Sequence, residues 1–277
     1  MSIGMQMDNK DIRLTILGCG TSTGVPLLHC KCRVCRSRNP KNQRLRASAL
    51  VSVGKKSFLI DTSTDLRQQA MRTKIGRIDA VLYTHPHADH VHGIDELRSF
   101  NFIQDNHIPV YGNAWVCDEL LQRFPYIFQR KTNQEGGGVP LLTLNQIDPA
   151  AEKIEVAGVT IIPIPLAHGS KESIGYRFDS IAYVTDCGYI PSSSLDRLKG
   201  ISVLVLDCLR IKPHGTHFNV DQALEIVSSV RPKKTYLTHM GHDFDYIEWK
   251  NKLPRGVALA YDGLKIFVKH RDMQERG

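Results

Sequence analysis

Short runs of aliphatic and β-branched residues recur along most of the chain and are interrupted by turn-forming residues. Such runs predict strands, because branched side chains pack well on a pleated surface. The predicted strands cover residues 12–17, 46–53, 57–60, 80–84, 108–111, 159–164, 181–185, 202–207, 234–237, 257–260 and 264–268. Apolar residues at helical spacing predict helices over residues 64–72, 93–104, 114–124, 192–198 and 220–229. Helices interspersed among strands favour an α/β fold.

The chain is predicted to form one domain. Its 277 residues contain no repeat, low-complexity tract or Pro- and Ser-rich linker, so residues 12–277 are expected to fold as a single unit. Residues 1–11 are predicted to be a flexible N-terminal tail, and residues 134–139, with three consecutive glycines, a mobile loop. No apolar run approaches the about 20 residues of a bilayer span, and the first residues lack the apolar core of a secretory signal. The expectation is a cytoplasmic protein without membrane contact.

The charge balance is basic, with 36 Lys and Arg against 28 Asp and Glu and a net charge of +8. Much of the excess lies between Lys31 and Arg46, a segment that contains no acidic residue. A basic surface attracts anions, including phosphates and nucleic acid. A solvated loop with spare charge explains the same run, so the charge gives only weak support for an anionic substrate.

Chemically capable side chains follow several predicted strands directly. Asp61, His85 and Asp186 come immediately after strands, and His239 follows strand 234–237 by two residues. A sheet holds groups at its strand ends rigidly while leaving them exposed to a substrate. The sequence therefore predicts a site at the strand ends.

The segment after strand 80–84 carries three histidines and one aspartate within six residues: His85, His87, Asp89 and His90. Neutral imidazole and carboxylate suit zinc, manganese or iron. In an extended segment His85 and His87 can point the same way, whereas Asp89 and His90 can face a second ion as the chain turns. A lone His-x-His pair is often structural, but the whole pattern after an apolar strand favours a metal site.

This pattern resembles the signature of the metallo-β-lactamase superfamily, whose fold is an αββα sandwich of two mixed sheets flanked by helices. The superfamily has one His, one Asp and one His further along the chain, each after a strand. The residues that match in order are His168, Asp186 and His239. Asp61 resembles an early aspartate of the superfamily that supports the ligand histidines through hydrogen bonds.

The resemblance implies a dinuclear centre of two divalent ions, either manganese or zinc. One ion would be held by His85, His87 and His168. The other would be held by Asp89, His90 and His239, with Asp186 as the bridge. A water between two cations about 3.5–4 Å apart loses its proton near neutral pH and becomes an in-line nucleophile. Asp89 and Asp186 would thereby take part in catalysis.

A second metal site is predicted in the loop that contains Cys30, Cys32 and Cys35. A tetrahedral structural zinc needs four ligands, and His242, three residues after His239, is a candidate for the fourth. The alternative is three reduced cysteines without metal. The other four cysteines, in or beside apolar strands or on a helix, are predicted to be small core residues: Cys19, Cys117, Cys187 and Cys208.

The two predicted sites together resemble the PhnP-type phosphodiesterases, which act on cyclic phosphates such as 5-phosphoribosyl 1,2-cyclic phosphate. Besides the cysteine loop, the matching segments are LTILGCGTSTGVP (14–26), IDT (60–62), THPHADHVHGI (84–94), LTHMGHDFD (237–245) and YDG (261–263). The resemblance implies a phosphodiesterase of small or cyclic phosphodiesters. It also implies a homodimer.

In that family a histidine before a late helix is the proposed proton donor to the leaving group. His217 matches it by position, and His214 is a nearby competitor. An imidazole suits this role, because its pKa lies near the working pH and it can protonate a departing alkoxide.

Three other functions remain as alternatives. RNase Z-like endonucleases share the ligands, but they carry a long tRNA-gripping arm for which the sequence shows no comparable insertion, so nucleic acid is the less favoured substrate. PqqB-like proteins share the cysteine loop but tend to lose active-site ligands, and none is missing here. A non-catalytic metal-binding module would not explain the complete ligand set together with His217.

Overall fold

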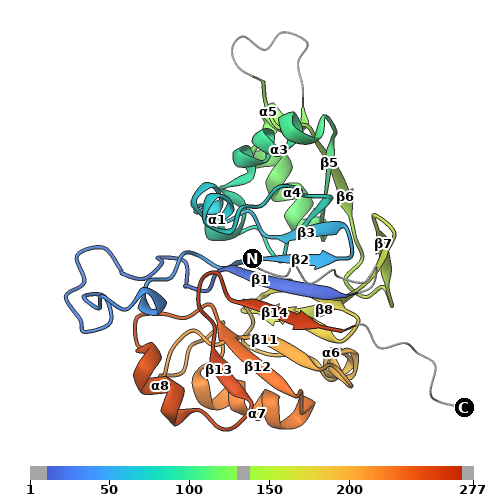
Figure 1. The fold of residues 1–277 in the computed structure, drawn as a ribbon. Coiled ribbons are helices and arrows are strands. Elements are labelled where there is room, and N and C mark those ends of the chain that lie inside the picture. The colour runs from blue at the N-terminus through green and yellow to red at the C-terminus, as the bar shows by residue number, and fades with distance from the viewer. Residues whose placement is uncertain (1–10, 130–137, 270–277) are drawn as a thin grey trace, which may run out of the picture.

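The computed structural model describes residues 11–129 and 138–269, which form two facing β-sheets with helices on their outer sides (Figure 1). The first sheet contains, in spatial order, β14 (Lys265–Val268), β1 (Ile12–Gly18), β2 (Ser48–Val53), β3 (Lys56–Ile60), β4 (Ala80–Leu82), β5 (Ile108–Gly112) and β6 (Leu142–Gln146). The second contains β13 (Val257–Leu259), β12 (Lys234–Thr238), β11 (Val203–Asp207), β10 (Ile181–Val184), β9 (Lys171–Phe178), β8 (Val159–His168) and β7 (Ile154–Val156). The predicted αββα sandwich is confirmed.

Each sheet has an antiparallel part and a parallel part. Strands β3 to β6 are parallel in the first sheet, and β10 to β13 are parallel in the second. Parallel neighbours need crossover connections, which helices provide. The helices of the first half are α1 (Leu66–Thr73), α2 (Ala88–Val91), α3 (Leu97–Gln104), α4 (Ala114–Arg123) and α5 (Pro125–Phe128). Those of the second half are α6 (Ser192–Leu198), α7 (Val220–Val230) and α8 (Tyr246–Lys252).

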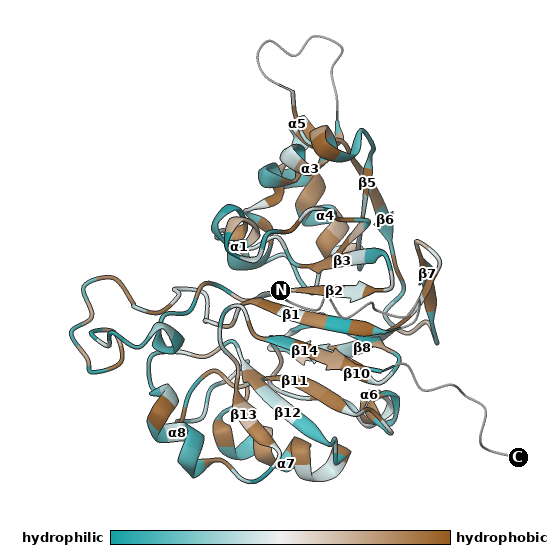
Figure 2. Ribbon diagram, viewed as in Figure 1, coloured by the Kyte–Doolittle hydropathy of each residue, from teal (hydrophilic) through white to brown (hydrophobic). Residues whose placement is uncertain are grey.

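The hydrophobic core has two layers, and strand β3 shows how they are separated. Phe58 and Ile60 belong to the larger cluster between the sheets, where the rings of Phe58 and Phe178 lie 5.5 Å apart. Leu59, which points to the opposite face, belongs to the cluster under the helices of the first sheet. A strand covered on both faces is continuously apolar, as the brown strands of Figure 2 show.

The predicted start of helix α7 is confirmed in detail. The Asn219 side chain accepts a hydrogen bond from the Gln222 backbone N–H, and the Gln222 side chain accepts one from the Asn219 N–H. This reciprocal arrangement pairs two backbone donors at the helix start. It also fixes the chain immediately after His217.

Some elements were not predicted, chiefly β6, β7, β9 and α8. Strand β9 opens with two charged residues, which hide its start, yet its whole length pairs with β8. Helix α8 has only seven residues and depends on the Asp245 side chain, which accepts hydrogen bonds from two backbone N–H groups of its first turn.

Of the predicted tail and mobile loop, residues 1–10 and 134–137 lie outside the described residues. Among the described helices, none is long and apolar enough to cross a membrane.

Asp262, in the loop before β14, ties distant parts of the first sheet together. Its carboxylate accepts hydrogen bonds from the Cys19 N–H at 3.2 Å and the Leu45 N–H at 2.9 Å. Burial raises the pKa of Asp262 to about 6, although these N–H groups and the nearby Arg72 favour the charged form.

This pKa predicts a pH dependence of stability. Because the folded state binds the proton of Asp262 more tightly than the unfolded chain, this group favours folding below about pH 4, and its contribution is lost as the pH rises through 6. The change amounts to about 3 kcal/mol. Asp262→Asn should remove this pH dependence. The free energy of unfolding of the variant, taken relative to that of wild type, should therefore be higher at pH 7.5 than at pH 4.5. Denaturant unfolding at both pH values checks this, and parallel pH profiles would contradict it.

Candidate metal centres and active site

The predicted site residues converge at the carboxyl ends of strands from both sheets. Asp61 directly follows β3, one residue separates Asp186 from the end of β10, and His239 directly follows β12. Each of these three has a left-handed backbone, with φ of 61°, 55° and 58°. For a residue other than glycine this conformation costs on the order of 1–3 kcal/mol. The surrounding structure thus holds three strand ends in a strained conformation where their side chains meet.

The first group of side chains contains three histidines. The His87 Nδ1 atom lies 2.9 Å from His85 Nε2 and 3.4 Å from His168 Nε2. One ligand atom from each of the three lies within 4.8 Å of the others. Burial, followed by the neighbouring His90, lowers the pKa of His85 well below its usual value. His85 is therefore neutral, which is the form of imidazole that binds a metal.

The second group contains Asp89, His90 and His239, whose ligand atoms also lie within 4.8 Å of one another. Asp89 Oδ2 is 3.2 Å from His90 Nε2 and 3.7 Å from His239 Nε2. Asp186 lies between the two groups. Its Oδ1 is 3.2 Å from His239 Nε2 and 3.8 Å from His85 Nε2. Asp186 therefore has the position that a bridging carboxylate requires.

The bonding of these side chains fits a dinuclear centre. The Nε2 atoms of His90 and His239 are buried and make no hydrogen bond, although unpaired buried polar atoms are costly. Two carboxylates, Asp89 and Asp186, are buried beside them. Buried carboxylates need positive charge nearby, and two divalent cations would pair both the carboxylates and the free imidazole nitrogens.

Further hydrogen bonds fix the directions of the histidine rings. Asp61 Oδ2 accepts a hydrogen bond from His90 Nδ1 at 2.8 Å, and Asp61 itself accepts two from Thr84. His168 Nδ1 donates to the Thr216 carbonyl oxygen at 3.1 Å. Such partners leave Nε2 of each ring free to bind a metal. The predicted supporting position of Asp61 matches this geometry.

Asp207 is a site residue that the sequence analysis missed. It ends β11 and is buried, and its Oδ1 lies 3.3 Å from His217 Nδ1. The same carboxylate accepts hydrogen bonds from the backbone N–H groups of Asp186 and Phe218. The signal in the sequence was the same as for Asp61, an acidic residue at the end of an apolar strand. Asp207 thus links the strand that leads to Asp186 with the loop that carries His217.

His217 lies against the predicted metal ligands. Its ring stacks on His239, with centroids 4.8 Å apart and an angle of 7° between the planes. Burial lowers the pKa of His217, but the Asp207 carboxylate outweighs burial and raises it to about 9. His214 is half-buried, and its ring centroid is 5.2 Å from that of His217. The pairing with Asp207 distinguishes His217 from its competitor.

The cysteine loop lies in a segment that projects beyond the sheets at the left of Figure 1. His242 Nδ1 lies 3.3 Å from Cys30 Sγ, 3.4 Å from Cys32 Sγ and 3.5 Å from Cys35 Sγ. Burial raises the pKa of Cys32, but hydrogen bonds from the Cys35 backbone and His242 outweigh it and lower the pKa to about 6. Thiolate is the form that binds zinc. The convergence of three sulfur atoms and one imidazole nitrogen within 4.8 Å of one another fits a tetrahedral structural site.

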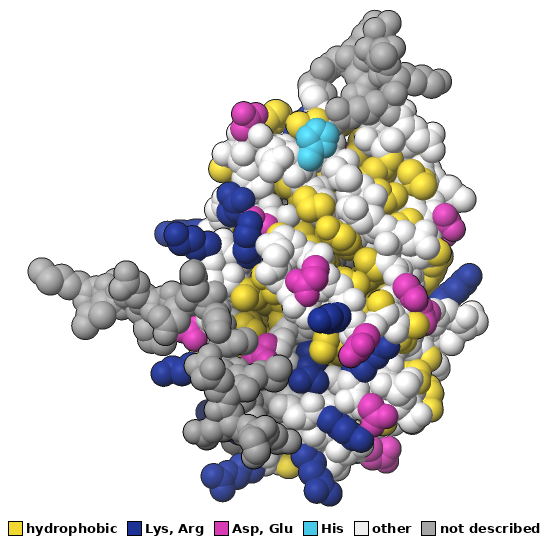
Figure 3. Space-filling view, turned by 90° about the vertical axis from the view of Figure 1, so that its right-hand side faces the viewer, with side chains coloured by type: hydrophobic (Ala, Val, Ile, Leu, Met, Phe, Trp, Pro, Cys, Tyr) yellow, Lys and Arg dark blue, Asp and Glu magenta, His cyan; other side chains and the backbone are white. Residues whose placement is uncertain are grey.

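Much of the basic run between residues 31 and 46 has structural contacts. Arg44 is buried and donates to the carbonyl oxygens of Gly241 and Phe244, which joins the cysteine loop to the segment of His242. Arg46 forms an ion pair with Asp65 at 2.9 Å. Part of the basic charge therefore has a structural role in holding this segment in place. Figure 3 shows the side of the molecule at the right of Figure 1, away from this segment, where acidic and basic side chains are interspersed.

We expect Cys32→Ser to lower stability before it affects chemistry. Loss of one thiolate from a structural zinc site removes binding energy that is coupled to folding. The variant should lose about one zinc per chain and melt at a lower temperature, with activity falling as a consequence. Elemental analysis and thermal unfolding measure both effects. Cys117→Ser, which changes a buried cysteine on α4, is the matched control. A Cys32 variant with normal zinc content and melting temperature would contradict this structural site.

Comparison with known proteins agrees with this architecture. A family model described as a beta-lactamase superfamily domain matches residues 56–240, and the chain belongs to the metallo-β-lactamase superfamily. It has that fold and contains a buried His/Asp cluster that could hold metal ions. It resembles a crystal structure of a new diphosphatase from the PhnP family, with 41% identity, a TM-score of 0.86, and coverage of 93% of this chain and 97% of that chain.

Two further relatives extend the comparison. Zn²⁺-bound PqqB from Methylobacterium extorquens shares the fold, with 19% identity, a TM-score of 0.74, and coverage of 92% of this chain and 99% of that chain. An octanoyltransferase of Porphyromonas gingivalis is 34% identical over 267 residues, which are 95% of this chain but 53% of the relative. The chain thus spans about half the length of that curated relative.

Proposed function

We propose that the protein is a dinuclear metal-dependent phosphodiesterase that hydrolyses small phosphodiesters, cyclic ones included. The observation that carries the proposal is the position of Asp186 between two groups of potential ligands, with the His217–Asp207 pair beside it. The seven proposed ligands are His85, His87, Asp89, His90, His168, Asp186 and His239. Manganese and zinc both suit this mixture of imidazole and carboxylate.

Several of the protein's own residues would take part in this reaction. Divalent ions held in the two groups would activate a water and neutralise the charge that develops on the phosphoryl oxygens. His217 would donate a proton to the leaving oxygen, and Asp207 would hold the His217 ring through Nδ1 so that Nε2 carries this proton. Asp61 and the Thr216 carbonyl would keep His90 and His168 in place.

A diphosphate is the second candidate substrate, and the similarity to a PhnP-family diphosphatase favours it. Each phosphorus of a disubstituted diphosphate carries two bridging oxygens and one negative charge, as a phosphodiester does. The same ions and the same in-line geometry therefore serve both. The leaving groups differ, because a phosphate departs readily whereas an alkoxide needs a proton. Octanoyl transfer is not proposed, because much of that relative's length has no counterpart in this chain.

Turnover of bis(4-nitrophenyl) phosphate after loading with Mn²⁺ or Zn²⁺ tests the proposal. We expect turnover that is lost on removal of the ions with a chelator and restored by adding them. A disubstituted diphosphate and a five-membered cyclic phosphate should be assayed beside it. Faster cleavage of a tRNA precursor than of every small substrate would overturn the proposal in favour of an RNase Z-like endonuclease. A homodimer remains a prediction from the family resemblance.

A further inference from the structure

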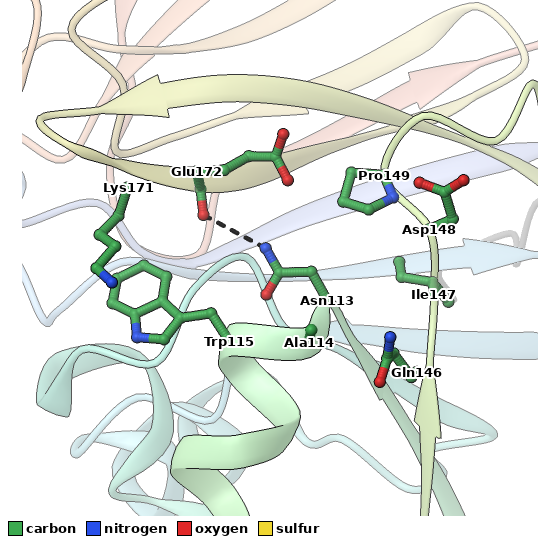
Figure 4. Close-up of a pocket in the computed structure, with 9 residues that line it drawn as sticks. All are labelled: Asn113, Ala114, Trp115, Gln146, Ile147, Asp148, Pro149, Lys171 and Glu172. Carbon is green, nitrogen blue, oxygen red and sulfur yellow. Dashed lines mark hydrogen bonds between the residues drawn. The ribbon is translucent and has the colours of Figure 1, made fainter.

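A cavity of about 370 Å³ lies between strand β6, helix α4 and the hairpin of β8 and β9 (Figure 4). Its lining comes from three short segments: 113–115 at the start of α4, 146–149 after β6, and 171–172 at the start of β9. Its volume is near the lower end of the range for small-molecule sites, about 300–1,000 Å³. None of its lining residues belongs to the seven proposed ligands.

The cavity adjoins the first histidine group through Trp115. The indole ring centroid is 5.8 Å from that of His87 and 6.4 Å from that of His85. Lys171, at the same end of the cavity, pairs directly with His168 in the β8–β9 ladder. A group bound in the cavity would therefore lie next to a phosphorus held at the metal centre.

His217 lies at the other end of the same row of rings. The contacts run from His217 to His168 at 4.9 Å, from His168 to His87 at 5.1 Å, and from His87 to Trp115 at 5.8 Å. A leaving group that receives a proton from His217 would face one end of this row. The group that stays on the phosphorus would face the other end, where the cavity opens.

The lining changes in character along the cavity. At the metal end, Lys171 Nζ lies 5.6 Å from the centroid of Trp115, which combines a positive charge with a flat aromatic surface. At the far end stand the exposed side chains of Gln146 and Asp148, with Glu172 facing them (Figure 4). Burial raises the pKa of Glu172, and the charge of Asp148 adds to this rise, so the two carboxylates interact.

This lining favours an uncharged ring that bears hydroxyl groups. The indole of Trp115 provides a flat apolar surface on which a ring can pack. Ionised carboxylates accept hydrogen bonds but donate none, so Asp148 and Glu172 suit hydroxyl groups and repel a second phosphate. Gln146 can both donate and accept.

We propose that this cavity binds the retained arm of a linear substrate with two arms, and that this arm is a hydroxyl-bearing ring such as the sugar of a nucleoside. The inference rests on the proposed function and deepens it. In a simple cyclic phosphate both ester oxygens belong to one ring, so no separate arm extends away from the leaving oxygen. A cavity on the side opposite His217 serves instead a diester or diphosphate that carries a group on each side of the bond that breaks.

The test compares two substrates that share a leaving group and differ in the retained arm: thymidine 5′-(4-nitrophenyl phosphate) and methyl 4-nitrophenyl phosphate. Wild type should prefer the thymidine ester, mainly through a lower KM. Trp115→Leu should reduce the ratio of the two kcat/KM values by about tenfold, and Gln146→Leu should reduce it in the same direction. Because both substrates use the same metal centre, a change in metal content alters both kcat/KM values equally and leaves their ratio unchanged. Gln122→Leu, an exposed position on α4, is the matched control and should keep the wild-type ratio.

A binding measurement separates this inference from the proposed function. The chain has two tryptophans, Trp115 and Trp249. In Trp249→Phe, thymidine 5′-monophosphate should quench the emission of Trp115 saturably, whereas Trp115→Phe should show no such change. Quenching without turnover of any diester would contradict the proposed function and leave the cavity as a binding site. Turnover with an unchanged substrate ratio in Trp115→Leu, or without quenching, would overturn the cavity assignment alone.

Discussion

Asp186→Ala is expected to lower hydrolysis of phosphodiesters by at least about 10³-fold, because it removes the carboxylate that would bind both ions of the proposed centre. Asp186 lies 3.2 Å from His239 Nε2 and 3.3 Å from His90 Nε2, so its loss affects both groups of ligands. The protein should then hold fewer than two exchangeable ions per chain. The zinc of the cysteine site should stay. Elemental analysis and steady-state kinetics on the same preparation measure both effects.

The control for this variant is Asp118→Ala, which removes an exposed carboxylate from α4. It should keep the wild-type content of metal and the wild-type rate. Full activity in Asp186→Ala, or loss of the cysteine-bound zinc alone, would contradict the assignment of Asp186 as the bridge. The contrast with Cys32→Ser is informative, because that change should act through stability instead.

His217→Ala should leave the ions bound and lower activity in a way that depends on the leaving group. A poor alkoxide leaving group needs its proton, so the loss of the donor should cost about 10²–10⁴-fold. A 4-nitrophenolate group departs well without protonation, and a diphosphate has a good leaving group as well, so both reactions should suffer less. The measurement compares the kcat values of wild type and variant on an alkyl diester, a 4-nitrophenyl diester and a diphosphate.

The outcomes of this comparison distinguish three roles. Equal losses on all three substrates would show that His217 positions the phosphate and is not the proton donor. No loss on any of them would remove His217 from the reaction and favour its competitor His214, for which His214→Ala is the matched variant. Asp207→Asn should reproduce part of the leaving-group dependence, because an amide holds the ring less strongly than a carboxylate does.

Much of the fold could be predicted because the apolar runs that form the core end at the polar residues of the site. In strand β3, apolar residues continue up to Ile60 and give way to Asp61, so the end of the strand and the position of a polar side chain are set together. The order of His168, Asp186 and His239 along the chain matched the superfamily pattern, and in the structure Asp186 lies close to each of the other two. Local composition was sufficient at these strand ends, although it did not single out Asp207 at the end of β11.

Other features could not be predicted because they depend on contacts between distant segments. Asp207 follows an apolar strand as Asp61 does, but its place in the site depends on His217, ten residues further on. The cavity at Trp115 is formed by segments far apart in the sequence. Strand β9 opens with Lys171 and Glu172, and it is a strand because it pairs with β8 along its length. Such features depend on packing between segments that are distant in the sequence.

Titration of the metal-free protein tests the central claim most directly. The cysteine site is first filled with one zinc per chain, and Mn²⁺ is then added in steps while binding and hydrolysis of bis(4-nitrophenyl) phosphate are followed together. We predict that activity is absent at the start and reaches its plateau when two further ions are bound per chain. Full activity before any Mn²⁺ is bound, or no activity with both ions in place, would contradict a dinuclear metal-dependent phosphodiesterase.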